Sequence, residues 1–173
     1  NGIGIVRRIT GGGAIYLVPE IALTAQLLSR IGSRFAEREI AVLHSGISQS
    51  ARYDQWKRIR RGEIRVVVGA RSALFAPVRN LRLIVVDEEQ DASFKQAEGF
   101  RYSARDLAVA RARLQGVPVV LGSATPAIET YANAVGGRYS LLTLSERIGA
   151  PAPRIVCLDT RNERLADGLS PRG

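Results

Sequence analysis

The sequence is poor in the features that mark disulfide-bonded, zinc-binding and membrane proteins. Its 173 residues include one cysteine, Cys157, and one histidine, His44, so an internal disulfide and a zinc site built from cysteine and histidine are both excluded. No apolar run approaches the roughly 20 residues that span a bilayer, and residues 1–8 lack the layout of a signal peptide. We therefore expect a cytoplasmic protein that does not bind a membrane.

Acidic residues are also scarce relative to basic ones. The chain carries 16 aspartates and glutamates against 25 lysines and arginines, which gives a formal net charge of +9. An excess of this size favours a polyanionic partner, and nucleic acid fits it better than a membrane surface does. The length allows one substantial hydrophobic core and is short for two full domains.

Short apolar runs alternate with segments of helical periodicity along most of the chain. Such alternation is typical of repeated βαβ units, whose right-handed crossovers build a mainly parallel sheet with helices on both faces. The sequence thus predicts an α/β fold. The expected strands are 14–18, 40–44, 65–69, 81–87, 117–122, 140–144 and 154–158. The expected helices are 21–35, one from Ser48 to Gly62, one capped by Ser103 and Asp106 that ends near Gly116, and one with Pro126 in its first turn that ends near Gly136 and Gly137.

The strand expected at 81–87 runs directly into a cluster of carboxylates, Asp87, Glu88, Glu89 and Asp91. In open α/β sheets ligands bind at the carboxyl ends of the strands, so these acids would lie where the metal ion of a nucleotide is held, as in a Walker B site. Crowded carboxylates repel one another unless a cation, an arginine or a proton relieves them. The alternative is a core strand followed by a solvated acidic turn.

Two other strand ends carry polar side chains that we expect at the same edge. Ser123 and Thr125 follow the strand expected at 117–122, among small residues that permit close approach of a ligand. Arg71 and Ser72 follow another strand and are suited to a phosphate oxygen. A plain turn with a helix cap, and a surface arginine at a helix start, are the respective alternatives.

Between the acidic cluster and the next helix, aromatic and basic residues alternate without strand or helix periodicity. This combination is typical of surfaces that bind single-stranded nucleic acid, where bases stack on the aromatic rings and basic side chains contact the backbone. The alternative is that the rings fold inward and anchor a long loop. The residues concerned are Phe94, Lys95, Phe100, Arg101 and Tyr102.

Six segments, in this order, resemble the motifs of the first helicase lobe of the PriA (primosomal protein N′) family of replication-restart DNA helicases, in helicase superfamily 2. They are residues 17–24 as motif Ia, 44–46, 69–75, 87–90 as motif II, 94–102 as the aromatic-rich loop and 122–126 as motif III. The resemblance covers nearly the whole chain. It implies a RecA-like, three-layer helicase lobe over residues 1–148, and over 149–173 a connector toward a second lobe that these residues do not contain.

The resemblance also implies roles for the residues at the predicted strand ends. Asp87 would hold Mg²⁺, Glu88 would polarise the water that attacks the γ-phosphate of ATP, and Gln90 would complete the nucleotide side of the site. Ser123 and Thr125 would couple that site to DNA.

On the DNA side, the resemblance makes the aromatic-rich loop a sensor of single-stranded DNA, with Arg71 and Ser72 against the DNA backbone. It implies ATP-driven 3′-to-5′ translocation on forked or single-stranded DNA. The expected partners are DNA, other primosome proteins and single-stranded DNA-binding protein. Zinc sites are implied for the second lobe and not for this chain.

Two departures from the family pattern limit which functional roles the resemblance implies for this chain. Position 90 is Gln90 where members with this motif II usually have histidine, and an amide keeps its hydrogen-bonding capacity but cannot take a positive charge. The sequence also contains no Gly-x-x-x-x-Gly-Lys-Ser/Thr; the glycine-rich run 10–14 has no lysine. We therefore expect a lobe without the phosphate-binding loop and its strand, a piece of a larger ATPase that does not turn over ATP alone.

Two other functions remain open at this point. A nucleic-acid-binding adaptor without catalysis would share the charge and the aromatic loop but would not bind nucleotide. Another superfamily 2 translocase would share motifs II and III but not this aromatic loop.

Overall fold

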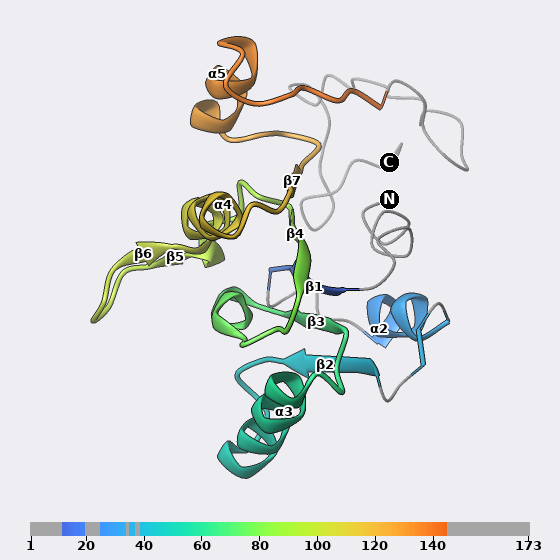
Figure 1. Ribbon diagram of the computed structural model, residues 1–173. Helices are drawn as coiled ribbons and strands as arrows, with labels where there is room; N and C mark the ends of the chain where they lie inside the picture. Colours follow the sequence, from blue (N-terminus) through green and yellow to red (C-terminus); the bar gives the residue numbers. More distant parts are fainter. Residues whose placement is uncertain (1–11, 20–24, 34, 37–38, 145–173) are drawn as a thin grey trace, which may run out of the picture.

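A parallel five-stranded sheet lies at the centre of the molecule (Figure 1). The computed structural model describes residues 12–19, 25–33, 35–36 and 39–144. The strand order is β2-β3-β1-β4-β7, and every neighbouring pair is parallel. The strands are β1 (Gly13–Leu17), β2 (Ile40–Leu43), β3 (Val66–Gly69), β4 (Leu81–Asp87) and β7 (Val119–Gly122).

The central strands are apolar on both faces because helices cover both sides of the sheet. On β1, Ile15 and Leu17 pack into one core cluster, whereas Ala14 and Tyr16 pack into a second cluster on the opposite face. Alternate residues of a strand point to opposite faces, so a strand buried on both sides loses the usual apolar and polar alternation. This is why β1, β3 and β4 read as nearly continuous hydrophobic runs.

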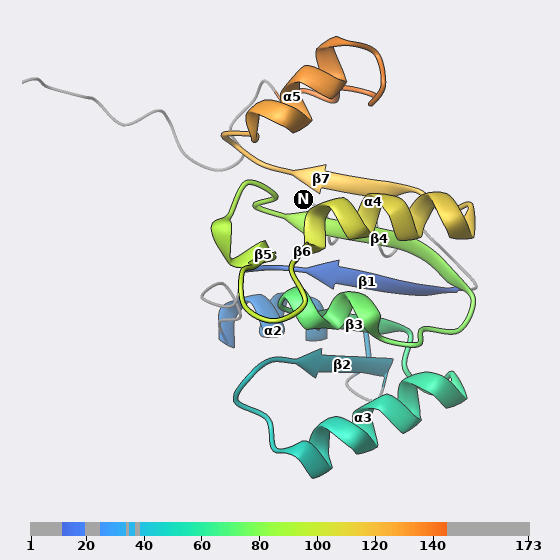
Figure 2. The same cartoon turned by 90° about the vertical axis from the view of Figure 1, so that its left-hand side faces the viewer.

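Helices on the two faces complete a three-layer arrangement (Figure 2). Helix α2 (Ala25–Gly32) packs through Leu27 and Ile31 on the face that contains Tyr16. Helices α3 (Gln49–Arg61) and α4 (Ala104–Gln115) cover the other face, together with the short 3-10 helix η3 (Arg71–Phe75). The α/β architecture expected from the sequence is confirmed.

Local sequence signals fix the ends of α3 and α4. Ser48 caps α3 by accepting a hydrogen bond from the Ala51 amide, and Gly62 ends the helix in the left-handed conformation with φ of 83°. Ser103 caps α4 in the same way by accepting from the Asp106 amide, and Gly116 ends it. Both pairs of helix ends were predicted from the sequence.

The segment between β4 and α4 forms a small antiparallel hairpin. It begins with the 3-10 helix η4 (Ala92–Phe94) and continues into β5 (Lys95–Gln96) and β6 (Tyr102–Ser103). We call residues 95–103 the aromatic hairpin. Figure 2 shows it in front of the sheet, near the carboxyl ends of the strands. It therefore leads from the end of β4 directly into the cap of α4.

Two expectations need correction, and three others fall wholly or partly outside the described residues. The strand expected at 140–144 is wrong: these residues have no regular secondary structure, and Leu141, Leu142 and Leu144 are exposed. Helix α5 spans Ile128–Val135 with Ala127 as its cap, so Pro126 precedes the helix instead of occupying its first turn. Residues 21–24 and 34 of the helix expected at 21–35, the strand expected at 154–158 and the connector at 149–173 lie outside the described residues.

None of the helices in the described part of the chain is long and apolar enough to cross a membrane.

Candidate functional site

Strands β4 and β7 end side by side at the carboxyl edge of the sheet. Asp87, the last residue of β4, pairs in register with Gly122, the last residue of β7. A Cβ atom added to Gly122 would lie 3.3 Å from Oδ1 of Asp87, so a larger residue would crowd this carboxylate. The acidic cluster and the Ser123–Thr125 segment therefore meet at one rim, as the sequence predicted.

Tyr16 fixes one oxygen of the Asp87 carboxylate. Its hydroxyl donates a hydrogen bond to Oδ2 of Asp87 at 2.6 Å, from the neighbouring strand β1. Only 3% of Tyr16 is exposed, and burial, followed by the hydrogen bond to Asp87 and the charges of Asp87 and Glu88, raises the pKa of Tyr16. The phenol is thus protonated at neutral pH and donates to Asp87 there. No sequence signal identified it, because a tyrosine inside a buried strand looks like any core residue.

Glu88 lies in a tight turn directly after β4. Its backbone is left-handed, with φ of 49°, a conformation that non-glycine residues adopt only when their surroundings hold them there. Here the Glu89 amide donates to the carbonyl of Gly122 at 3.0 Å, and the Asp91 amide donates to the carbonyl of Glu88 at 2.8 Å. The Glu88 side chain is exposed to solvent.

Gln90 bridges the two strand ends through both atoms of its amide. Its Nε2 donates to Oε2 of Glu88 at 2.9 Å, and its Oε1 accepts from the hydroxyl of Ser123 at 2.6 Å. The Ser123 hydroxyl oxygen in turn accepts from the Thr125 amide at 2.9 Å. The Gln90 amide therefore makes a continuous hydrogen-bonded path from Glu88 to Thr125.

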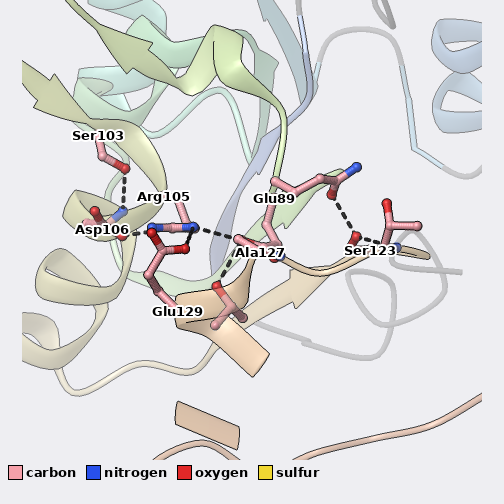
Figure 3. Close-up of polar contacts among 10 residues, drawn as sticks. Glu89, Ser103, Arg105, Asp106, Ser123, Ala127 and Glu129 are labelled. Carbon is pink, nitrogen blue, oxygen red and sulfur yellow. Dashed lines mark hydrogen bonds and ion pairs between the residues drawn. The ribbon is translucent and has the colours of Figure 1, made fainter. Parts of the chain in front are cut away.

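Glu89 points away from this rim and into the protein, where it meets two helices (Figure 3). Only 2% of the residue is exposed. Its Oε1 accepts from the Ala127 amide at 2.7 Å, and its Oε2 accepts from the Thr130 hydroxyl at 2.9 Å and from Nη1 of Arg105 at 3.3 Å. The acidic cluster is thus divided, because Glu88 faces solvent and Glu89 is buried and paired.

Arg105 is the cation of this buried network. Its Nε donates to Oδ1 of Asp106 at 2.8 Å, and its Nη1 also lies 3.9 Å from Oε2 of Glu129. The hydrogen bond to Asp106 is the main reason that the pKa of Arg105 is raised. Neither Arg105 nor the inward orientation of Glu89 could be foreseen, since the partners are 16 residues apart in the chain.

The aromatic hairpin displays the ring of Phe100, whereas the ring of Phe94, just before the hairpin, is buried. Phe94 is 1% exposed and belongs to the main hydrophobic core, so the expectation that it contacts DNA is wrong: its ring anchors the start of the hairpin. Phe100 is 79% exposed and lies 6.0 Å from the half-buried ring of Tyr102. The charged neighbours Lys95 and Arg101 are exposed.

Arg71 and Phe75, both from η3, hold this hairpin against the body of the protein. Nη1 of Arg71 donates to the carbonyls of Ser93 and Lys95 at 3.2 and 2.8 Å. The Phe75 ring meets the edge of Tyr102 at 5.4 Å and is 48% exposed. Arg71 thus binds the loop backbone, whereas it was expected to contact the DNA backbone; Ser72, beside it, is exposed.

The rim offers few protein ligands for a metal ion. Among the described residues no group of three histidine, cysteine, aspartate or glutamate side chains is placed to hold one. One oxygen of Asp87 is occupied by Tyr16 and the other lies beside Gly122. Such a site fits Mg²⁺, which keeps several waters and binds substrate phosphates together with one or two carboxylates.

Comparisons with known proteins identify a family and several relatives of the chain. The family model for DEAD/DEAH box helicases matches residues 3–134. The chain is 49% identical to the replication restart protein PriA of Bacillus subtilis and 46% identical to that of Chlamydia pneumoniae, in each case over 88% of its own length. It spans 19% and 20% of those relatives.

Among solved structures, the C-terminal domain of the DEAD-box protein Dbp5 is similar, with a TM-score of 0.50 at 15% identity, over 80% of this chain and 79% of that one. At this identity the likeness concerns the fold alone. It agrees with the expected RecA-like lobe, and the resemblance to replication-restart helicases is confirmed.

Proposed function

The chain belongs to the DEAD/DEAH box helicase family, and from this premise we propose that it forms the ATP-facing and DNA-facing part of a DNA helicase that acts in replication restart. The observation that carries the proposal is the bridge from Glu88 through Gln90 to Ser123. It joins the ends of β4 and β7 at the edge where α/β proteins bind their ligands.

On the nucleotide side, Asp87 would hold Mg²⁺ with Oδ1, while its Oδ2 accepts the hydrogen bond from Tyr16 that orients the carboxylate. Bound there, Mg²⁺–ATP would supply the γ-phosphate that is cleaved, and the Mg²⁺ ion would supply positive charge against the negative charge of the phosphates. Glu88 is the carboxylate exposed beside that position and is available to orient a water and accept its proton. Gln90 would keep the Glu88 side chain at the rim and link its position to Ser123 and Thr125.

On the DNA side, Phe100 and Tyr102 would stack on bases, and Lys95 and Arg101 would contact phosphates. A base stacked on one such ring contributes about 1–3 kcal/mol, so a single displayed ring matters. Phe75 extends this surface, because its ring packs on Tyr102 and remains half-exposed. Exposed rings of this kind favour single-stranded DNA, because its unpaired bases can stack on them.

The remaining parts of the proposal concern the larger protein. The 173 residues contain no Walker A motif, so the backbone amides and lysine that cradle the phosphates are not among them, and we expect no ATP turnover by these residues alone. We assign residues 1–148 to one helicase lobe and 149–173 to a connector. Translocation from 3′ to 5′, a cytoplasmic location and contacts with primosome proteins and single-stranded DNA-binding protein belong to the same proposal.

Hydrolysis is tested in the natural gene product that contains this sequence. Glu88→Gln should lower kcat for ATP by about 100-fold or more, because general acid–base groups contribute at least that much. Binding of a non-hydrolysable ATP analogue should stay within about twofold, since the amide is isosteric. An unchanged kcat would overturn the role of Glu88, and failure of the wild type to bind nucleotide would point to a non-catalytic adaptor.

The DNA surface is tested by comparing DNA-stimulated and basal ATP hydrolysis. Phe100→Ala and Tyr102→Ala should reduce the stimulated rate more than the basal rate, because the rings contact DNA and not nucleotide. Tyr131→Ala is the matched control, since Tyr131 is an exposed aromatic residue on α5. Equal losses in both rates would indicate that the rings serve folding instead.

A further inference from the structure

Glu89 is a buried carboxylate that joins three segments of the chain. It leaves the turn after β4, and its oxygens are held by the first turn of α4 through Arg105 and by the start of α5 through the Ala127 amide and Thr130. A buried charge of this kind is strongly destabilising when its partner is removed. The pair of Glu89 and Arg105 therefore ties the turn after β4 to the first turn of α4.

At one end of this pair lies the aromatic hairpin. Arg105 is the second residue of α4, and the cap of that helix, Ser103, is the last residue of β6. Tyr102 precedes the cap and carries the contacts to Phe100 and Phe75. The hairpin therefore continues directly into the first turn of α4, so a shift of the hairpin would move that turn. In the same turn, Arg105 binds both Asp106 and Glu89.

Glu88 lies at the other end of the Glu89–Arg105 pair. Hydrogen bonds made by neighbouring residues hold its backbone conformation. Its left-handed φ of 49° is one that its own side chain disfavours. The turn is held by the amide of Glu89 on Gly122 and by the carboxylate of Glu89 on the two helices. The position of the Glu89 side chain consequently helps to set the direction in which Glu88 projects.

We propose that the Glu89–Arg105 pair is a positioning device that transmits the state of the aromatic hairpin to Glu88. The proposal rests on the proposed function, since it assumes that the hairpin contacts DNA and that Glu88 acts on water. Binding of single-stranded DNA moves the hairpin and the first turn of α4, and Arg105 carries Glu89 with it. Glu88 then turns toward its working orientation. Neither Glu89 nor Arg105 touches DNA or nucleotide.

Arginine is suited to this role because its planar group binds two carboxylates at once in a fixed geometry. Here it joins Asp106 of its own helix to Glu89 of the turn. Lysine keeps the charge that Glu89 requires but presents a single flexible ammonium, so it cannot hold both partners in one geometry. Arg105→Lys therefore separates charge compensation from rigid coupling.

The experiment compares Arg105→Gln and Arg105→Lys in the natural gene product. Arg113→Gln is the control, because Arg113 is an exposed arginine in the last turn of the same helix. In both Arg105 variants the ratio of DNA-stimulated to basal ATP hydrolysis should fall about fivefold or more. Affinity for a thymidine oligonucleotide and for an ATP analogue should stay within about twofold, and the control should behave as the wild type.

Hydrogen exchange gives a second readout that needs no turnover. The amides of Glu89 and Asp91 are hydrogen-bonded in the turn that holds Glu88. Adding the oligonucleotide to the wild type should change their exchange rates, whereas the same addition to Arg105→Gln or Arg105→Lys should not. This readout stays valid even where Arg105→Gln lowers stability, because Arg105→Lys keeps the buried charge compensated.

Two outcomes would overturn the inference. One is a wild type in which DNA stimulates hydrolysis but leaves the exchange of these two amides unchanged. The other is an Arg105→Lys variant with full stimulation and the wild-type exchange response. In both, DNA-stimulated hydrolysis survives, so the proposed function stands while the inference fails. A wild type that neither binds DNA nor hydrolyses ATP would instead refute the proposed function, and the inference with it.

Discussion

Replacing Gln90 by glutamate should destabilise the turn after β4 by about 2 kcal/mol at neutral pH. The change is nearly isosteric, so packing is kept. The Ser123 hydroxyl can still donate to the new side chain, but the Nε2 donor that lies 2.9 Å from Oε2 of Glu88 is lost. Two carboxylates then face each other across that distance.

The magnitude follows from two contributions. Loss of one hydrogen bond costs about 1 kcal/mol net. Two like charges about 4 Å apart repel by about 1 kcal/mol in water and about 4 kcal/mol at an effective dielectric constant of 20. Glu88 is exposed, so the value for water applies more closely and the sum is about 2 kcal/mol. Gln90→Ala loses hydrogen bonds but adds no charge, so its effect should be nearer 1 kcal/mol.

The pH dependence distinguishes repulsion from lost packing. Urea unfolding of both variants is followed from pH 7 down to about pH 4, where glutamate takes up a proton. In Gln90→Glu the crowded native state binds that proton more readily than the unfolded chain does, so its deficit relative to the wild type should shrink as the pH falls. The deficit of Gln90→Ala, which introduces no charge, should change less over this range.

A double variant provides the decisive control. Combining Glu88→Gln with Gln90→Glu exchanges the amide and the carboxylate, so the donor and acceptor face each other again with their roles reversed. The combined variant should regain at least about 1 kcal/mol over Gln90→Glu alone. Failure to regain stability, or a Gln90→Glu deficit that does not change with pH, would refute the bridge as the cause.

Two further predictions concern stability. Tyr16→Phe should cost about 1–2 kcal/mol through the lost bond to Asp87; because the pKa of Tyr16 is raised above 10.0, this difference should be complete below about pH 10 and shrink at higher pH in urea unfolding. Arg111→Ala should cost about 2 kcal/mol, because this half-buried guanidinium donates to the carbonyls of Leu74 and Ala76 at the end of η3. A loss below about 0.5 kcal/mol, the range of an ordinary surface substitution, would contradict the latter.

Much of the fold could be predicted because its signals are local. The strand at 81–87 was expected with the bounds that the structure gives to β4, since a β-branched apolar run ending in a carboxylate is visible in a short window. The ends of α3 and α4 could be predicted equally well, because serine caps and left-handed glycines act within one helical turn. Strand ends in a parallel sheet share an edge, so the meeting of Asp87 with the segment after β7 also followed.

The errors arose where burial or a distant partner decides the outcome. Phe94 and Phe100 look alike in the sequence, yet one lies in the core and the other is displayed, because only the packing of α4 and η3 determines which ring fits inside. The segment 140–144 has strand-like composition but no strand conformation, since a strand exists only through its neighbours.

The amino-acid sequence alone determined the class of the protein: a parallel α/β lobe, basic enough for nucleic acid, with acids and hydroxyls at the ends of adjacent strands. Tertiary structure decided which of those groups is exposed at the rim and which is buried and paired. Glu88 and Glu89 are adjacent residues of the same type, but the turn exposes Glu88 to solvent and directs Glu89 toward Arg105. Hydrogen bonds from Glu89 to partners 16 to 41 residues away make that choice, and no short window of sequence contains both partners.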